Sequence, residues 1–371
     1  MCCAVVSLVI SNLSFGYDYV SFWHSRLDLS VAGLSMDYDL MHWINDGLMA
    51  LFFLLVGLEI ERELYKGELT GVRNALLPTI AAFGGMLVPG LIHFSLNVGT
   101  QTQSGFGVPV ATDIAFALGI LSLAGGRIPV TLKILLAALA IMDDLGAVLV
   151  IALFYAPGFS VLYFTAAMVV FVGMISLNRL KVNILFPYLS GGLLMWFFML
   201  RSGVHPTIAG VLLAFAIPFR EGERASPSYK MQHLLCKPVA FVILPIFALA
   251  NTAMIFEPGW YGSFIDCNTA GIMLGLVIGK PLGIFLFTLI AVKTGLGKLS
   301  AELSWRHVFG MGIIAGIGFT MSIFIANLAF SEQHTIQNSK LAVLCASAVA
   351  GAAGYLFLSR MGRRFREKRA L

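Results

Sequence analysis

The stretch ALAIMDDLGAV, residues 138–148, decides how this chain folds. It sets Asp143 and Asp144 side by side near the middle of an apolar segment, about residues 130 to 155. An ionised carboxylate at the centre of a membrane span costs about 2.5 to 3.5 kcal/mol, so two cost roughly 5 to 7 kcal/mol before any pairing. A carboxylate in a helix cap or loop at the cytosolic surface is the alternative, but apolar sequence continues on both sides. The pair therefore predicts a protonatable or cation-binding site inside a membrane.

Composition places the chain among polytopic membrane proteins. Of its 371 residues, 58% are hydrophobic and only 12% are charged, and the mean hydropathy is +0.89. These values lie far from those of an average soluble domain. Because one helical span takes about 20 apolar residues, the chain has room for about ten to twelve spans and no separate soluble domain. We therefore expect one transmembrane domain over residues 1–371, with a net charge of +5 that faces acidic lipid and not nucleic acid.

The five cysteines have neither metal-ligand nor disulfide spacing, so we interpret them as packing residues. Cys2 and Cys3 precede the first apolar run and do not follow a signal sequence, which argues against a lipoprotein anchor.

Twelve apolar segments follow one another along the chain. The first is short for a membrane crossing, which suggests a late start codon or a truncated first helix. The seventh and eighth are separated only by Arg201 and Ser202 and are also consistent with one bent element. The segments lie near residues 1–13, 40–58, 75–96, 106–123, 130–155, 161–177, 184–200, 203–218, 236–256, 270–292, 307–330 and 340–359.

The distribution of basic residues supports this count. If both termini are cytoplasmic, twenty of the 24 lysines and arginines lie on the cytoplasmic side, including a basic tail at residues 360–371. Only Arg26, Arg201 and Lys340 lie outside, and Lys280 falls within a span. This bias follows the positive-inside rule and predicts a multi-pass protein with cytoplasmic termini.

The loop between the first two spans, residues 14–39, contains a period-two pattern. In HSRLDLSVAGLSM, residues 24–36, apolar residues alternate at Leu27, Leu29 and Val31 before Gly33. The alternation and the turn residue predict an external hairpin, although a plain loop is the other interpretation. An exposed hairpin edge is able to pair with a second copy of the chain.

Two spans carry interruptions. The fourth contains Pro109, Thr112 and Asp113, which remove a backbone donor or compete with helical hydrogen bonds, and this predicts a broken helix. The eleventh contains GIIAGIGFTMS, where Gly312, Gly316 and Gly318 precede Thr320 and Ser322. Glycine also serves helix packing alone. Non-helical backbone inside a membrane lines a cavity or is buried in protein, and two interrupted spans in matching halves indicate a transporter binding site.

Two groups of charged residues remain. Lys280 lies near the middle of the tenth span, where a lysine needs a carboxylate partner or loses its proton, and Asp113, Asp143 and Asp144 are the intramembrane carboxylates that we identify. At the end of the second span, in GLEIERELYKGEL, the residues with helical spacing are Glu59, Arg62 and Glu63. They form either a solvated helix end with local ion pairs or a charged funnel at an ion entrance.

Six stretches resemble, in order, the NhaA family of sodium/proton antiporters, and together they span nearly the whole chain. The resemblance implies an all-α polytopic membrane protein of about twelve helices, with inverted repeats, two broken helices crossing at the midplane, and a small external hairpin; this family is itself a type example of that architecture. The stretches are WINDGLMALFFLLVGLE (43–59), ATDIAFALG (111–119), ALAIMDDLGA (138–147), SGVHPTIAG (202–210), IGKPLG (278–283) and GIGFTMSIFIA (316–326).

The resemblance also implies roles for single residues. Asp144 is the principal Na⁺ ligand, and Asp143 joins it while pairing with Lys280. Thr112 and Asp113 line the crossing, where Asp113 and Lys280 compensate the partial charges of half-helix ends. Gly316 and Gly318 form the backbone of the second break, and the pH-response residues are Glu59, Arg62, Glu63, His205 and His233. Gln232 and Cys236 stand where better-known members carry a glutamate and a second histidine, so the pH threshold is not carried over.

Together these features imply a secondary transporter, and not an enzyme, that exchanges cytoplasmic Na⁺ or Li⁺ for external H⁺. Adjacent helix residues are about 100° apart, so one aspartate can face Lys280 while its neighbour faces a cavity. Carboxylates and freed carbonyls supply the oxygen ligands that sodium prefers, so protons and sodium compete for the same groups. The family implies an electrogenic, pH-regulated exchange in the cell inner membrane, without a cofactor and with a possible homodimer formed through the hairpin.

Two other classes of protein use charge inside a membrane. An intramembrane aspartyl protease has two carboxylates that share protons. Its GxGD signature is absent from this sequence, and Lys280 has no role in its chemistry. A cation channel needs a ring of charge or carbonyls from a repeated pore loop, and no such repeat is visible.

Overall fold

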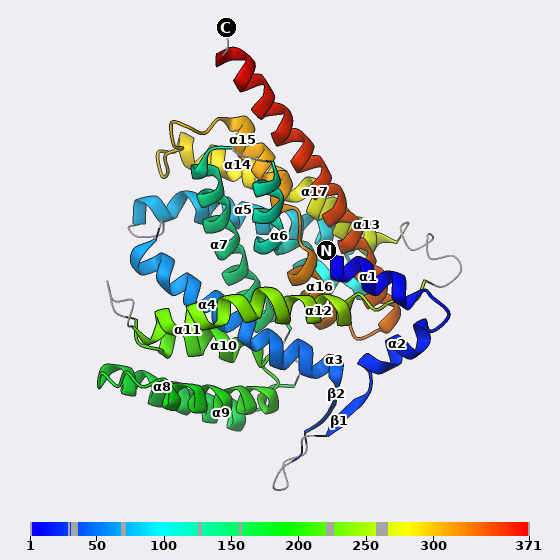
Figure 1. The fold of residues 1–371 in the computed structure, drawn as a ribbon, viewed down its shortest axis with the longest axis vertical. Coiled ribbons are helices and arrows are strands. Elements are labelled where there is room, and N and C mark those ends of the chain that lie inside the picture. Colours follow the sequence, from blue (N-terminus) through cyan, green and yellow to red (C-terminus); the bar gives the residue numbers. More distant parts are fainter. Residues whose placement is uncertain are drawn as a thin grey trace. The chain divides into compact units, whose positions relative to one another are not determined.

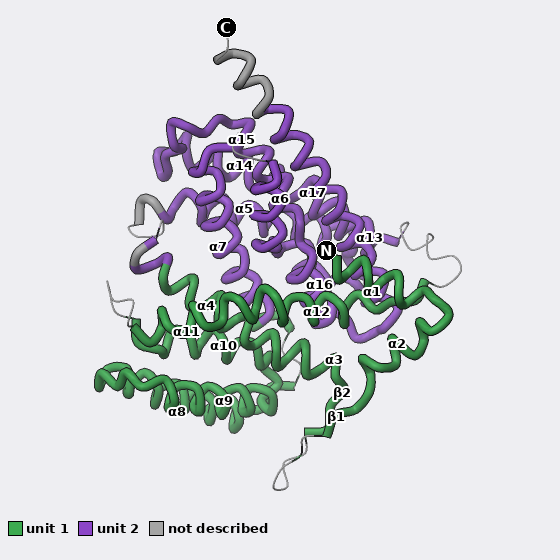
Figure 2. The backbone as a smooth tube through the Cα atoms, in the orientation of Figure 1, with its two compact units in different colours: residues 1–62, 152–260 green, residues 63–151, 261–371 purple. Residues whose placement is uncertain are grey.

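The computed structural model of this chain describes residues 2–28, 30, 36–67, 72–124, 128–155, 158–219, 226–256 and 266–369. The described chain is mostly helical (Figure 1). It groups into two compact units (Figure 2). Unit 1 contains Met1–Arg62 and Ala152–Trp260, and unit 2 contains Glu63–Ile151 and Tyr261–Leu371. Each unit therefore combines an early and a late part of the chain.

Long apolar helices make this a multi-pass membrane protein. Seven helices of the described chain are long and apolar enough to cross a membrane, and three bent helix pairs raise the candidate spans to as many as ten. The seven are Leu40–Tyr65, Ala75–Leu96, Val130–Phe154, Val161–Arg179, Pro227–Asn251, Cys267–Lys293 and Gln333–Met361. The bent pairs are Cys2–Ser11 with Gly16–Trp23, Gln101–Val110 with Ile114–Leu123, and Trp305–Ala315 with Phe319–Ala329.

Unit 1 begins with two short helices and a hairpin, and it continues with helices from both parts of the chain. Helix α8 packs along α9, and Gly203, at φ 80°, separates α9 from α10, so the seventh and eighth predicted segments are two helices and not one bent element. The elements are α1 (Cys2–Ser11), α2 (Gly16–Trp23), β1 (Arg26–Asp28), β2 (Asp37–Asp39), α3 (Leu40–His42), η1 (Trp43–Leu48), α4 (Met49–Lys66), α8 (Val161–Arg179), α9 (Phe186–Ser202), α10 (Thr207–Ala216), α11 (Pro227–Pro238), η3 (Val239–Ile243) and α12 (Leu244–Asn251).

The predicted hairpin is confirmed as a small antiparallel sheet. Strand β1 pairs with β2 in a register that sets Arg26 opposite Asp39, and the guanidinium of Arg26 lies 2.9 Å from the carboxylate of Asp37. Hydrogen bonds from Ser30 hold the pKa of Asp28 below its usual value. The turn residues 31–35 and Leu29 lie outside the described part of the chain.

The helix of the ninth predicted segment, residues 236–256, starts earlier than the sequence predicts. Helix α11 begins at Pro227, where the hydroxyl of Ser226 accepts a hydrogen bond from the N–H of Tyr229, whereas apolar sequence begins only near residue 236. The prediction was wrong because the start of this helix is amphipathic: Met231 and Leu235 are buried, while Lys230, His233 and Lys237 are exposed. As a result, His233 lies on a helix.

Unit 2 holds the helices that carry the interrupted stretches. Helix α17 begins at Gln333, ahead of the predicted start, and it continues into the predicted basic tail, whose last two residues lie outside the described part. The elements are α5 (Val72–Leu96), η2 (Gln101–Val110), α6 (Ile114–Leu123), α7 (Val130–Phe154, to Ile151 in this unit), α13 (Cys267–Leu274), η5 (Gly275–Gly279), α14 (Lys280–Lys293), α15 (Trp305–Ala315), α16 (Phe319–Ala329) and α17 (Gln333–Arg369).

Helices α5 and α14 make the most extensive helix–helix contact in the described part of unit 2, and glycine permits it. A Cβ added to Gly283 of α14 would overlap the carbonyl oxygen of Gly84 on α5. Small residues at membrane helix interfaces let backbones approach in this way. The contact holds Lys280, one turn before Gly283, beside α5, where its Cε would lie 3.9 Å from a Cβ on Gly85.

Both predicted helix breaks are present. The first lies at residues 111–113 between η2 and α6, and the two axes are bent by 45°. The second lies between α15 and α16, which are bent by 49°, with Gly316 and Gly318 at the ends of the two helices. Gly312 lies inside α15 and is not part of the break. A Cβ on Gly316 would overlap the carbonyl oxygen of Leu276, so close approach and not a special φ explains this glycine.

Candidate ion-binding site

The two helix breaks of unit 2 touch each other. The N–H of Asp113 donates to the carbonyl oxygen of Ile317 at 2.7 Å. The hydroxyl oxygen of Thr112 lies 3.0 Å from the carbonyl oxygen of Ala315, the last residue of α15. Breaks that are about 200 residues apart in the sequence therefore satisfy each other's backbone groups, as buried non-helical backbone requires.

Asp113 caps two helices at once. Its Oδ1 accepts a hydrogen bond from the N–H of Phe116 in the first turn of α6, at 3.1 Å. Its Oδ2 accepts from both the N–H, at 3.1 Å, and the hydroxyl of Thr320 in the first turn of α16. The N-termini of helices carry partial positive charge, so one carboxylate here stabilises both half-helices.

An ion pair between Asp143 of α7 and Lys280 of α14 lies beside the breaks. Nζ of Lys280 is 3.0 Å from Oδ2 of Asp143, and both side chains are 0% exposed. Lys280 also donates to the carbonyl oxygen of Val110, the last residue of η2. Because a helix C-terminus carries partial negative charge, the ammonium stabilises η2 as well as the carboxylate. Of the three carboxylates that the sequence offers to Lys280, the structure therefore brings Asp143 into direct contact.

The carboxylate oxygens of Asp143 and Asp144 differ in the contacts that they make. Oδ2 of Asp143 accepts the hydroxyl hydrogen of Thr112 at 2.6 Å in addition to its contact with Lys280. Oδ1 of Asp143 is buried and has no hydrogen-bond partner in the described part of the chain. Asp144 is 1% exposed, and its charge also interacts with Lys280. Carboxylate, hydroxyl and carbonyl oxygens are the hard ligands that a small alkali cation prefers.

The same region has no cluster for a transition metal. Among the described residues, no three histidine, cysteine, aspartate or glutamate side chains are grouped so that they could hold a metal ion. The oxygen atoms at the breaks come from carbonyls and from the hydroxyls of Thr112 and Thr320 in addition to the carboxylates. The donor set therefore suits a weakly bound, exchangeable cation better than a resident metal.

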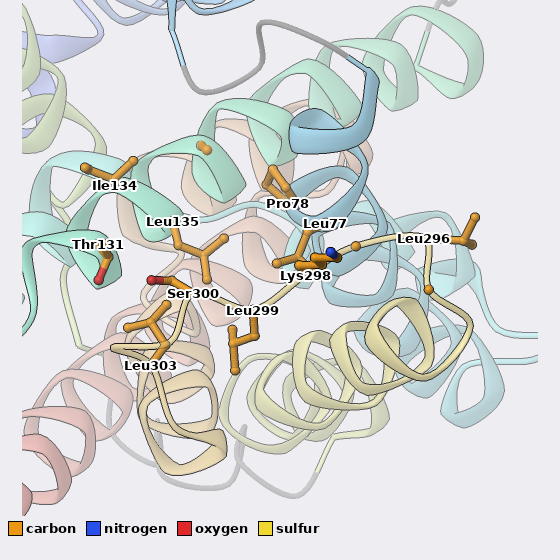
Figure 3. Close-up of a pocket in the computed structure, with 13 residues that line it drawn as sticks. Leu77, Pro78, Thr131, Ile134, Leu135, Leu296, Lys298, Leu299, Ser300 and Leu303 are labelled. Carbon is orange, nitrogen blue, oxygen red and sulfur yellow. The ribbon is translucent and has the colours of Figure 1, made fainter.

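A cavity of about 240 Å³ lies elsewhere in unit 2 (Figure 3). It is formed by α5, the start of α7 and the connection between α14 and α15, and Asp143 and Asp144 are not among its lining residues. Its walls are mostly apolar, with Thr131, Lys298 and Ser300 as polar residues. The cavity is separate from the carboxylate pair.

Sequence reasoning missed a buried acidic group in unit 1. Asp46, in η1, is 7% exposed, and its carboxylate lies 3.0 Å from Nε2 of His42 and 3.4 Å from Nε2 of His205. Nδ1 of His205 is 2.8 Å from the hydroxyl of Thr207. Asp46 interrupts the apolar segment at 40–58 just as Asp113 interrupts its own, so the same charge criterion identifies it. Asp46 lies in the candidate span Leu40–Tyr65, and it was not counted among the three carboxylates that the sequence offered to Lys280.

Glu61 is a second acidic residue that the sequence analysis passed over. It is 5% exposed and accepts a hydrogen bond from the hydroxyl of Ser228 on α11 at 2.9 Å. It lies between Glu59 and Arg62 on α4. Glu61 is buried and these two neighbours are at least partly exposed, because the three side chains point in different directions around the helix.

The predicted pH-response residues occupy different environments. Glu59, Arg62 and Glu63 follow one another on the last turns of α4. His205 is held in the Asp46 cluster of unit 1, whereas His233 is exposed on α11 with its ring parallel to that of Tyr229. Gln232 is buried and Cys236 is exposed.

Membrane-length helices, two interrupted helices that touch at their breaks, and a buried carboxylate–lysine pair at that contact define a secondary transporter. Comparison with known proteins agrees: the family model described as Na+/H+ antiporter 1 matches residues 1–358. The chain belongs to this family.

Several curated relatives carry the name Na(+)/H(+) antiporter NhaA. The chain is 56% identical to the protein of Dechloromonas aromatica, covering 96% of this chain and 91% of the relative. It is 53% identical to the protein of Cytophaga hutchinsonii, with 95% and 89% covered, and 44% identical to that of Shewanella frigidimarina, with 97% and 92% covered. The similarity therefore extends over nearly the full length of these proteins.

Proposed function

We propose that this chain is a secondary active antiporter that moves cytoplasmic Na⁺ out of the cell in exchange for external H⁺, for sodium and pH homeostasis. The observation that carries the proposal is the fully buried pair of Asp143 and Lys280 at the contact between two broken helices, with Asp144 beside it. The family and the names of the relatives support the identity of the two ions.

Protons and sodium compete for the same carboxylates in this proposal. When protons occupy the site, Asp143 and Asp144 are neutral, which suits the apolar surroundings of the two carboxyl groups but leaves Lys280 without a charged partner. When the protons leave, Asp144 and Oδ1 of Asp143 offer charged oxygens to the cation, while Oδ2 keeps its contacts with Thr112 and Lys280. Two protons leave for each sodium ion that binds, so the exchange is electrogenic. Li⁺ is also a hard cation and is a second substrate.

Alternating access follows from the broken helices. Thr112 and Asp113 connect the first break to the second, so a movement of either half-helix changes the ligands around the cation. We assign both units to one transporter domain of twelve spans with inverted repeats, in which the two broken helices occupy matching positions. The bias of basic residues supports cytoplasmic termini in the cell inner membrane.

Regulation by pH is assigned to groups outside the carboxylate pair. Glu59, Arg62 and Glu63 lie on the last turns of α4, and His205 contacts Asp46. His233 lacks the glutamate and second histidine expected near it, because Gln232 and Cys236 take those positions. A pH titration of sodium-driven exchange by the wild type and by His233→Ala tests this assignment: an unchanged midpoint in the variant removes His233 from the sensor.

A proteoliposome assay tests the function. The purified chain is reconstituted, a pH gradient is imposed, and sodium or lithium is added. We expect either ion to collapse the gradient in the wild type and neither to do so in Asp144→Asn, because the amide cannot carry the charge that binds the cation. Full exchange by a folded Asp144→Asn protein would refute the assignment of Asp144 to the ion-binding site. If neither ion collapses the pH gradient in the wild type, the proposed function is refuted.

A further inference from the structure

A second buried polar network lies in unit 2, where α5 ends and η2 begins. His93 of α5, Asn268 of α13 and Ser339 of α17 are all 0% exposed. Nε2 of His93 is 3.0 Å from Oδ1 of Asn268, and the amide of Asn268 donates to the hydroxyl oxygen of Ser339 at 2.8 Å. Because Oδ1 only accepts, His93 is the donor. One chain of hydrogen bonds therefore joins three helices.

Asn97 extends this network to the first broken helix. Its amide donates to the carbonyl oxygens of His93, at 2.9 Å, and Cys267, at 3.1 Å. Its Oδ1 accepts the hydroxyl hydrogen of Thr102 at 2.7 Å. Thr102 belongs to η2, the half-helix that ends at Val110 beside Lys280. Asn97 thus fastens η2 to α5 and α13.

The second broken helix is hydrogen-bonded to the first near the start of η2. The hydroxyl of Ser104, also in η2, donates to the carbonyl oxygen of Ala329, the last residue of α16, at 3.0 Å. Gly105 lies against the ring of Phe330, so closely that a Cβ there would overlap it. The two half-helices that run from the breaks to this end of the unit are therefore joined to each other and to the surrounding helices.

We propose that these residues act as an outer lock, defined as His93, Asn97, Thr102, Ser104, Asn268 and Ser339, which keeps the transport site closed toward the outside. The inference rests on the proposed function and on the topology that puts the start of η2 on the external side. The lock residues are positioning residues: they do not touch the cation, but they hold the half-helices that carry Thr112 and Asp113. Its hydrogen bonds are formed in this structure, and in this proposal they break when the site faces outward.

The energetic consequence is a shift in population. Contacts made only in the state closed to the outside favour that state by their net free energy. The apparent affinity on one side scales with the fraction of protein open to that side. Weakening the lock therefore improves sodium binding from outside and weakens it from the cytoplasm. If the network merely stabilised the fold, substitutions in it would lower the stability of the protein. They would not change the KM for sodium in opposite directions on the two sides of the membrane.

The test compares the KM for sodium on both faces, measured in right-side-out and inside-out membrane vesicles. In Asn268→Leu we expect the ratio of external to cytoplasmic KM to fall about tenfold, equivalent to about 1.4 kcal/mol, since the bonds to both His93 and Ser339 are lost. Thr102→Val removes one hydroxyl at nearly constant volume, and we expect a fall of about threefold.

Thr288→Val is the matched control. Thr288 is also buried, but its hydroxyl donates to the carbonyl oxygen of Ile284 in its own helix α14, at 2.6 Å, so we expect an unchanged ratio. An unchanged or increased ratio in both lock variants would overturn the proposal while leaving the exchange function intact. If Asn268→Leu does not fold, Thr102→Val decides alone. Wild-type vesicles without sodium-driven exchange would refute the proposed function, and the lock with it.

Discussion

Thr112 donates its hydroxyl hydrogen to Oδ2 of Asp143 at 2.6 Å, and the same hydroxyl lies 3.0 Å from the carbonyl oxygen of Ala315. One hydrogen can serve only one of these acceptors at a time. A charged Asp143 attracts it strongly, whereas a protonated Asp143 leaves it for Ala315. A threonine in the first break therefore links the state of the carboxylate to the backbone of the second.

The first prediction concerns this hydroxyl. Thr112→Val keeps the shape of the side chain but removes the donor, so we expect sodium-driven exchange to fall about tenfold, the effect of losing one hydrogen bond to a charged group. Thr112→Ser should retain most of the activity. Initial rates in proteoliposomes over a range of sodium concentrations check both variants. Equal activity of the valine and serine variants would contradict the role of the hydroxyl.

The second prediction uses the buried ion pair. Lys280→Met leaves the Asp143 carboxylate buried without its cation, which should destabilise the protein by about 3 to 5 kcal/mol. The double variant Lys280→Met with Asp143→Asn should recover most of that stability, because no uncompensated charge remains. Thermal unfolding of the detergent-solubilised proteins measures both. A double variant as unstable as Lys280→Met would show that the pair does not act as a unit.

The third prediction separates two roles of Asp113. Its carboxylate caps α6 and α16, and substitution of a cap by alanine costs about 0.5 to 2 kcal/mol for each helix. Asp113→Ala should therefore lower the thermal stability more than Asp113→Asn, which keeps an acceptor oxygen but loses the charge. Comparison of the two melting temperatures tests the capping role. If Asp113→Asn lowers the melting temperature as much as Asp113→Ala does, then the charge of Asp113, and not its role as a helix cap, accounts for its contribution to stability.

The fourth prediction concerns the second break. In Gly316→Ala, the new methyl group would overlap the carbonyl oxygen of Leu276, which belongs to the backbone of η5 and cannot rotate away. We expect a loss of about 1 to 3 kcal/mol in stability, typical of overpacking. Gly119→Ala, on α6, serves as the control because open space surrounds it. Melting temperatures that fall equally in both variants would contradict the close contact.

The fifth prediction tests the homodimer through the hairpin that the resemblance to the NhaA family implies. Both strands of the hairpin are short, and β1 is exposed while β2 is partly buried. The carbonyl oxygen of Leu27 already accepts a hydrogen bond from Nε1 of Trp43 at 3.2 Å, so a second copy of the chain would have to pair elsewhere along the hairpin. The carbonyl oxygen of Ser25 accepts from the N–H of Leu40, so the two ends of the hairpin are already adjacent. Replacement of residues 27–38 by two glycines should yield monomers that still exchange sodium. Light scattering after gel filtration gives the mass, and a dimer that survives the replacement would refute this interface.

Much of the architecture was accessible from local sequence. The apolar run at 130–155 became α7, Val130–Phe154, and both interruptions became breaks, because hydropathy and helix-breaking residues act within a few positions. The amphipathic start of α11 was missed, since polar residues on its exposed face hide the buried Met231 and Leu235 from a search for apolar runs.

The site was accessible in part. Charge in apolar sequence identified Asp113, Asp143, Asp144 and Lys280, and the same criterion would have found Asp46 had it been applied to the second span. The hydroxyl of Thr320 and the carbonyl of Val110, which complete the contacts of Asp113 and Lys280, carry no such signal.

The sequence by itself determined that this is a helical membrane protein with ionisable groups inside two interrupted halves, because the cost of burying charge in lipid depends on composition within one span. Only the tertiary structure decided that Lys280 contacts Asp143, that Asp113 caps α16 through Thr320, and that the two breaks meet. Those choices depend on how helices far apart in the chain are rotated and packed against one another. Side chains at neighbouring positions point in different directions around a helix, so only packing selects which of them meet.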